Sequence, residues 1–243
     1  MREEVTFNGI TISDFYQVGN VVRPLAGRSN TTMDVSGMDG TKITGSVMLP
    51  TTITVSFILS EKNETERRDA IRNITSMLHT TEPAPLMFAS DNGLYYMAIL
   101  DGDVPIQEHV RSGLIEANFK TESPVLYGKT RTVTVPSGGS ATIYVEGTYP
   151  ALPVISGTVY GLAQSSYQWG VRLDEGDYLR VVVGPNSAKQ VVMDCEHRIA
   201  TVGGLVALPT LTSDWFELSA GFHTIRNDQG SGSCTVRWQE RWM

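Results

Sequence analysis

Alternating apolar and polar residues predict β-strands in the first half of the chain. In "TTITVSFILS" (51–60) apolar side chains alternate with threonine and serine, which is the period of a half-buried strand. "GLIEANFKT" repeats this pattern, with Ile115, Ala117 and Phe119 on one face. The run "LYYMAIL" (94–100) follows the turn signal "SDNG" and is rich in aromatic and aliphatic residues. All three segments are therefore expected to be strands.

A single helix is predicted between these strands, in "NETERRDAIRNITSMLHT". Asn63 can cap it, and Glu66 lies three residues further on, where a carboxylate favours the start of a helix. Apolar residues then recur at helical spacing and form one stripe, which indicates packing against a sheet. The stripe consists of Ala70, Ile71, Ile74, Met77 and Leu78.

The second half of the chain shows no helical pattern. Short apolar runs such as "TIYVEG" and "DYLRVVVG" recur there, separated by turn-forming residues, which is typical of an antiparallel sandwich or jelly roll. We therefore predict a mainly β protein with one α-helix. Residues 1–132 are expected to form an N-terminal β-barrel or sheet domain, and residues 133–243 a C-terminal antiparallel β-sandwich. Near this boundary, "PSGGS" (136–140) is either a short linker or a hairpin turn.

One long polar segment, "RPLAGRSNTTMDVSGMDG" (23–40), has no periodicity of its own. Loops of this length inside a compact unit are usually functional arms or disordered. The pattern fits either description.

Composition narrows the range of partners. The 243 residues carry a formal net charge of −7, so the chain lacks the basic field that nucleic-acid binding requires. The longest apolar run, 94–100, is far too short to span a bilayer, and the opening residues contain no signal-peptide core. We expect a soluble protein made without a secretion signal, with no direct nucleic-acid recognition and no membrane insertion.

The stretch "VVMDCEHRIATVGG" (191–204) sets four reactive residue types side by side. Read as a strand, it places Cys195 and His197 on one face and Asp194 and Glu196 on the other, so that the carboxylates cannot activate the thiol. A zinc site would need a second ligand pair at short spacing, which the sequence lacks. We therefore predict no catalytic, metal or cofactor-binding residue.

The two cysteines, Cys195 and Cys234, are too few for a disulfide framework and are expected to be buried thiols rather than a bridge. All four tryptophans lie in the second half. They are interpreted as core and interface residues, although a sugar-stacking platform is the alternative.

The order of several short motifs resembles the distal tail proteins of long, flexible-tailed (siphovirus-type) bacteriophages. "FNGITISDF" looks like the opening strand pair of that family, and "VSGMDGTKITG" like its glycine–aspartate–glycine turn ahead of the strand "ITVSFIL". The helix "RRDAIRNITSML", a proline-bearing loop, "LYYMAIL" and "SGLIEANFKTESPVLYG" follow in the family's order. "EGTYPALPVI", "VVMDCEHRIATVGG" and "SCTVRWQERWM" continue the resemblance through the second half. The glycine–asparagine features of that half are degenerate, and no large insertion decorates it.

This resemblance implies a non-enzymatic structural protein at the distal end of the phage tail, synthesised in the host bacterial cytoplasm. Members of the family form a homohexameric ring through their N-terminal domains. The ring joins the major tail tube protein to the tail-tip protein, the tail-associated lysin. The C-terminal sandwich is expected to be galectin-like and to face outward, towards a receptor-binding protein or cell-wall polysaccharide.

Two hypotheses about particular residues follow. In the first, segment 23–40 supplies the subunit contacts of the ring, through Arg23, Arg28, Asn30, Asp34 and Met38. In the second, the C-terminal sandwich is a carbohydrate-binding module, with Trp169 or Trp215 as an exposed platform for polysaccharide.

Overall fold

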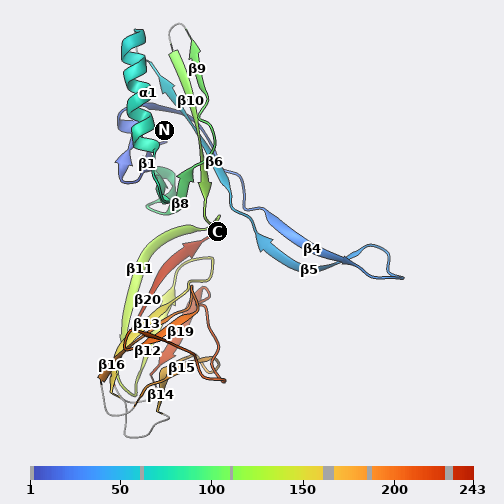
Figure 1. Cartoon of the computed structure of the whole chain (residues 1–243), viewed down its shortest axis with the longest axis vertical. Coiled ribbons are helices and arrows are strands. Elements are labelled where there is room, and N and C mark those ends of the chain that lie inside the picture. Colours follow the sequence, from blue (N-terminus) through green and yellow to red (C-terminus); the bar gives the residue numbers. More distant parts are fainter. Residues whose placement is uncertain (1–2, 61–62, 110–111, 161–166, 185–187, 228–231) are drawn as a thin grey trace. The chain divides into compact units, whose positions relative to one another are not determined.

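The computed structural model describes residues 3–60, 63–109, 112–160, 167–184, 188–227 and 232–243. The chain divides into unit 1, Met1–Tyr127 with Met243, and unit 2, Gly128–Trp242. The division falls inside strand β11 (Leu126–Val135), ahead of the predicted boundary after residue 132. Antiparallel strands make up most of both units and unit 1 holds the α-helix, which confirms the mainly β fold class (Figure 1).

Unit 1 is built on an antiparallel sheet in which β2, β1, β7, β8, β10, β6 and β3 follow one another, with β9 beside β10. Its strands are β1 (Val5–Phe7), β2 (Ile10–Thr11), β3 (Gln17–Val22), β6 (Thr52–Leu59), β7 (Ala84–Phe88), β8 (Tyr95–Leu100), β9 (Ile106–His109) and β10 (Ser112–Thr121). Two short 3-10 helices, η1 (Ile12–Asp14) and η2 (Ala89–Asp91), lie between them.

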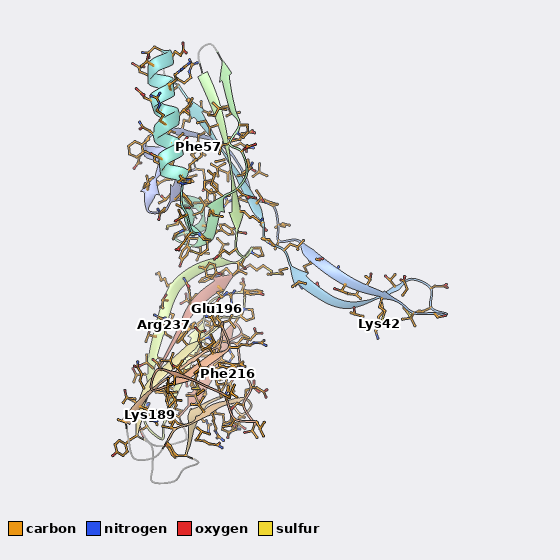
Figure 2. All side chains as sticks on the ribbon, in the orientation of Figure 1. Lys42, Phe57, Lys189, Glu196, Phe216 and Arg237 are labelled. Carbon is orange, nitrogen blue, oxygen red and sulfur yellow. The ribbon has the colours of Figure 1, made fainter. Side chains whose placement is uncertain are left out.

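The predicted alternation decides which face of this sheet is buried. In β6 the side chains of Ile53, Val55 and Phe57 point into the core, and Figure 2 shows Phe57 inside the unit. In β10 the buried residues are Ile115, Ala117 and Phe119, as the sequence predicts. Burial of such side chains contributes roughly 1.5–3 kcal/mol each, so this face is the main source of stability in unit 1.

Helix α1 (Glu64–Leu78) covers the core with the predicted stripe. Its side chains Ala70, Ile74 and Leu78 are buried. The side chain of Asn63 accepts a hydrogen bond from the backbone N–H of Glu66 at 2.8 Å, which satisfies one of the free donors at the helix start.

Segment 23–40 is regular in part. Residues Arg28–Asp34 form strand β4, which pairs with β5 (Thr41–Met48) in a two-stranded sheet of their own. Every residue of β4 is exposed. In Figure 1 the hairpin appears as an arm separate from the main sheet of its own unit, and Figure 2 labels Lys42 on it.

Unit 2 is an antiparallel sandwich, as predicted. One sheet runs in the order β18-β17-β16-β13-β20-β11 and the other in the order β12-β19-β14-β15. The strands are β12 (Ser140–Val145), β13 (Val154–Tyr160), β14 (Gln168–Leu173), β15 (Tyr178–Val182), β16 (Ala188–Asp194), β17 (Ile199–Val202), β18 (Leu205–Ala207), β19 (Gly221–Arg226) and β20 (Cys234–Trp242). The core between the sheets is apolar, and Trp169 is its largest fully buried side chain.

The segment 136–140 is neither a linker nor a hairpin turn. It is a tight turn, closed by a hydrogen bond from the Gly139 N–H to the Pro136 carbonyl oxygen. The turn passes the chain from β11 in one sheet to β12 in the other. It therefore lies within unit 2 and connects the two layers of the sandwich.

A buried carboxylate fixes the end of the sandwich. Glu240 of β20 is fully buried, and its Oε2 accepts hydrogen bonds from the backbone N–H groups of Glu146 and Gly147, both at 2.9 Å. Its Oε1 accepts one from Trp238 Nε1 at 3.0 Å. A Cβ on Gly147 would lie 2.2 Å from the Arg241 carbonyl oxygen, so glycine is required for this close approach.

We expect the substitution Glu240→Ala to destabilise unit 2 by about 3 kcal/mol, because it leaves three donors without their acceptor in a dry environment. Urea unfolding followed by tryptophan fluorescence measures this, since all four tryptophans lie in the second half of the chain. Glu217→Ala, at an exposed position, serves as the control and should change stability by less than about 0.5 kcal/mol. Equal unfolding midpoints for the two variants would contradict the structural role of Glu240.

Candidate assembly interface

The hairpin exposes apolar side chains on both of its faces. The β4–β5 register places Arg28, Asn30 and Asp34 on one face together with Ile43, because a bulge at the Thr31/Thr32 step shifts the pairing. Met33 and Val47 lie on the opposite face. Ile43 is 61% exposed and Val47 65% exposed. Neither face therefore has a core to pack on.

An isolated two-stranded hairpin is at best marginally stable in water. The exposed apolar residues of β4 and β5 therefore gain most from burial against another surface, and contiguous exposed apolar area is typical of interaction sites. The polar residues predicted for this role, Arg28, Asn30 and Asp34, lie on one face of the arm, and Met38 lies in the exposed connection between its strands.

Arg23 differs from the other residues proposed for the arm. It precedes the hairpin, and its Nη1 donates to both carboxylate oxygens of Asp91 at 2.7 and 2.9 Å while Nη2 donates to Ser90. Its guanidinium also lies 4.7 Å from the centre of the Phe88 ring. Arg23 thus ties the segment ahead of the hairpin to Ser90 and Asp91 of the same unit, and its role in subunit contacts stays a prediction.

The reactive-looking stretch 191–204 is a β-hairpin in the structure, made of the end of β16, a turn at 195–198 and strand β17. Strand β16 ends at Asp194, whose Oδ1 accepts hydrogen bonds from the backbone N–H groups of Glu196 and His197. The prediction that His197 shares the buried face of Cys195 is therefore wrong, because the chain leaves the strand before reaching it. His197 is exposed, and its Nδ1 lies 2.9 Å from Asp194 Oδ2.

Both thiols are buried, as predicted. Burial, together with the negative charge of Asp194, raises the pKa of Cys195 to about 12. Burial raises the pKa of Cys234 to about 11. Neither thiol is therefore ionised at neutral pH, and the two do not form a disulfide.

A partly exposed acid–histidine–serine cluster escapes sequence analysis, because Asp174 lies 49 residues before His223 in the chain. His223 Nδ1 lies 2.9 Å from Asp174 Oδ2, and His223 Nε2 lies 3.3 Å from Ser219 Oγ. The same Nε2 is closer, at 2.8 Å, to the carbonyl oxygen of Ser219. A carbonyl accepts hydrogen bonds and cannot donate them, so Nε2 carries a proton and cannot act as the base for the serine. The cluster therefore fastens β19 to the end of β14.

The two tryptophans proposed as a sugar platform differ in exposure. Trp169 is 0% exposed in the core of unit 2, so its proposed role as an exposed platform is wrong; its position on the inward face of β14 explains the burial. Trp215 is half-buried and lines a shallow cavity with Asp177, Arg198 and Glu217.

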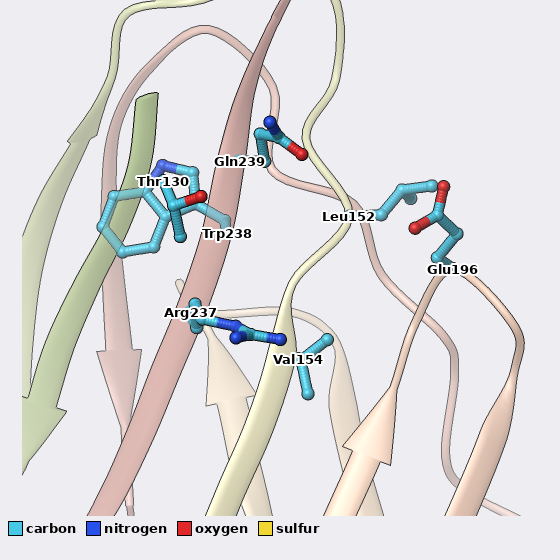
Figure 3. Close-up of a pocket in the computed structure, with 7 residues that line it drawn as sticks. All are labelled: Thr130, Leu152, Val154, Glu196, Arg237, Trp238 and Gln239. Carbon is cyan, nitrogen blue, oxygen red and sulfur yellow. The ribbon is translucent and has the colours of Figure 1, made fainter. Parts of the chain in front are cut away.

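A second cavity of about 240 Å³ lies at the end of the larger sheet of unit 2 (Figure 3). Glu196 approaches it from the turn after β16 and Arg237 from β20, and the buried Trp238 forms part of its wall. The described lining includes one carboxylate and one guanidinium, which is not the arrangement of a nucleophile and its base.

In the part of the chain that the structure describes, no three histidine, cysteine or acidic side chains gather as a metal ion would require. No helix of the described chain is long and apolar enough to cross a membrane.

Comparison with known proteins gives consistent matches over both units. Residues 9–121 match a phage tail protein RIFT-related domain, and residues 146–242 match the C-terminal domain of siphovirus-type tail components. The distal tail protein of Bacillus phage SPP1 is 24% identical over 230 residues, which cover 90% of this chain and 88% of that protein.

Two solved structures share the fold. The crystal structure of the SPP1 Dit protein, described as a paradigm of the hub adsorption apparatus in phages that infect Gram-positive hosts, matches with a TM-score of 0.77 and 19% identity, covering 100% of both chains. A chain of the phage p2 baseplate in its activated conformation with Sr matches with a TM-score of 0.50 and 9% identity, covering 97% of both chains.

The turn after β16 yields a prediction about charge. Burial alone would raise the pKa of Asp194, but the hydrogen bonds from His197 and Glu196 outweigh burial and lower it. The hydrogen bond and negative charge of Asp194 raise the pKa of His197. The Asp194 contribution to stability is present above that group's ordinary pKa of 3.8 and is lost as the pH falls through the lowered value. The His197 contribution is present below 6.5 and is lost as the pH rises through the raised value.

We therefore expect Asp194→Asn to lower the pKa of His197 towards its ordinary value, since the substitution removes the negative charge and replaces Oδ2, which faces His197 Nδ1, with an amide NH2 group. An NMR titration of the His197 ring protons measures this change. Asp214→Asn, at an exposed acidic residue, serves as a control and should leave the titration unchanged. An unaltered His197 titration in the Asp194 variant would rule out the pair.

Proposed function

Because this chain belongs to the distal tail protein family of siphoviruses, we propose that it forms a homohexameric ring in the tail-tip hub, through the β4–β5 hairpin of unit 1. It is a structural virion component of the distal tail. In the proposed assembly the ring joins the major tail tube protein to the tail-tip protein and the adhesion apparatus. This role requires binding surfaces and no catalytic activity.

The observation that carries the ring proposal is the hairpin with two uncovered faces. A head-to-tail contact, in which the arm of one subunit lies on the body of the next, generates a closed ring when the rotation between subunits closes. Such a contact buries one of the two faces of the arm. One face carries Ile43 with the polar residues Arg28, Asn30 and Asp34, and the other carries Met33 and Val47. The contact also removes the free strand edges of the arm from water.

We expect that replacing residues 30–46 with Asn-Gly abolishes the ring and leaves both units folded. Ser29 and Val47 face each other across the hairpin, so a two-residue turn can close the strands between them. Native mass spectrometry of the purified protein measures the subunit number, and thermal unfolding monitors the fold.

A matched pair of point variants sharpens this experiment. Ile43→Asp should weaken the ring, because it places a charge in the proposed contact. Leu211→Asp, at a fully exposed apolar residue of unit 2, should leave the ring intact. A ring that survives the shortened arm would refute this role of the hairpin.

We propose a second candidate function, the binding of cell-wall polysaccharide, for the cavity beside Trp215. A half-buried aromatic ring flanked by Asp177, Glu217 and Arg198 combines a stacking surface with hydrogen-bonding groups, which is the composition of many ligand sites.

For this site we expect Trp215→Ala to weaken polysaccharide binding at least tenfold, because the substitution removes the stacking ring. Isothermal titration with purified wall polysaccharides measures the affinity. Leu208→Ala, at an exposed residue outside the described lining, is the control. If the wild-type protein binds none of the polysaccharides tested, this second function is wrong.

A further inference from the structure

The outward face of the four-stranded sheet in unit 2 gathers arginines and aromatic rings. The strand register places these residues in two rows of the same face: Tyr144 pairs with Phe222 in one row, and Arg172 pairs with both Arg226 and Tyr178 in the other. The pair Thr142–Thr224 lies between the two rows. Their sequence neighbours along each strand point into the core. We name this set the arginine–aromatic face. It comprises Tyr144, Arg172, Tyr178, Arg180, Phe222 and Arg226.

The three guanidinium groups lie close to one another. Arg172 and Arg226 are direct cross-strand neighbours, an arrangement in which like charges destabilise a sheet. The guanidinium carbons of Arg172 and Arg180 lie 5.0 and 3.8 Å from the centre of the same Tyr178 ring. This stacking holds both cations in place. Arg172 Nη2 already donates to a backbone carbonyl oxygen and its Nε is buried, so only the remaining N–H groups of Arg172 can reach a further acceptor.

No carboxylate among the described residues forms an ion pair with these arginines. The hydrogen bond that Arg172 Nη2 donates to the Glu175 carbonyl oxygen leaves its charge uncompensated. The chain as a whole carries a net charge of −7, so a cluster of three arginines without an acidic partner is unusual in this protein. The repulsion between them would be relieved by an anionic partner.

The same face carries exposed aromatic surface. Phe222 is 76% exposed, and its ring centre lies 4.8 Å from that of its cross-strand partner Tyr144. Tyrosine, phenylalanine and arginine are the residue types that are enriched at protein–protein interfaces and at their energetic centres. An interface that spans the face would bury the aromatic pair and place acceptors against the arginines further along the same strands.

We propose that the arginine–aromatic face docks another protein of the same tail, through a patch that presents carboxylates to Arg172, Arg180 and Arg226. The guanidinium fork matches a carboxylate in a bidentate manner, and this charge complementarity defines the partner. At the arginine end of the face a protein fits better than a glycan, because the Tyr178 ring is already stacked against two guanidinium groups and is not free to stack on a sugar. The identity of the partner as a tail protein rests on the proposed function.

The test uses the full-length chain and, as probes, the other structural tail proteins encoded with it, each purified. Binding is measured by biolayer interferometry at low and at high salt. The test variant is R172E/R180E/R226E. The control variant is R68E/R72E/K129E, which makes the same change in net charge at exposed basic residues away from the face.

We expect one acidic tail protein to bind the wild-type chain and the control variant, and to bind the test variant at least tenfold more weakly. Added salt should weaken the wild-type interaction, because the contact is electrostatic. Phe222→Ala, which removes an exposed ring and spares the core, should weaken binding at least threefold without removing the salt dependence.

The proposal is overturned if no tail protein binds, or if the test and control variants bind equally well. It is equally overturned if the face proves to bind a wall polysaccharide or a second copy of this chain instead. Native mass spectrometry of the test variant keeps the two proposals apart. An unchanged subunit number shows that the loss of docking does not come from a failed ring. A wild-type chain that forms no ring refutes the proposed ring and does not bear on the docking proposal.

Discussion

Side chains on a β-strand alternate between two faces, and the structure depends on which of those faces is covered. In both units one face of each sheet is buried under a helix or a second sheet, and its residues supply the apolar core. The opposite faces remain open. The hairpin β4–β5 is the extreme case, because neither of its faces is covered by other described residues. The functional proposals concern these uncovered faces, and the buried carboxylate and the histidine cluster stiffen the framework behind them.

The same constraint explains what could be predicted from the sequence. The strands around Phe57 and Phe119 show alternation because one of their faces is buried, and the helix shows its stripe and its Asn63 cap for similarly local reasons. Segment 23–40 lacks periodicity although part of it is a strand, since a strand that is exposed on both faces has no reason to alternate. The pattern of apolar and polar residues therefore does not indicate that β4 pairs with β5.

Features that depend on contacts between distant residues were also beyond prediction. The pairing of Asp174 with His223 joins the turn after β14 to strand β19, and no spacing rule connects the two positions. Trp169 and Trp215 are the same residue type, but the sandwich buries Trp169 in its core and leaves Trp215 beside a cavity. The arginine–aromatic face likewise exists only once the register brings Arg226 beside Arg172. Residue types indicate chemistry, and the strand register decides which of them meet.

The burial of both thiols has a consequence for the life of the particle outside the cell. Cys195 and Cys234 are the only cysteines in the chain, and each remains a protonated, inaccessible thiol. Oxidants attack thiolates that reach the surface, so oxygenated surroundings find no sulfhydryl here to convert into an intermolecular crosslink. A tail component of this kind keeps its covalent structure in both reducing cytoplasm and aerated medium, without a redox step in its maturation.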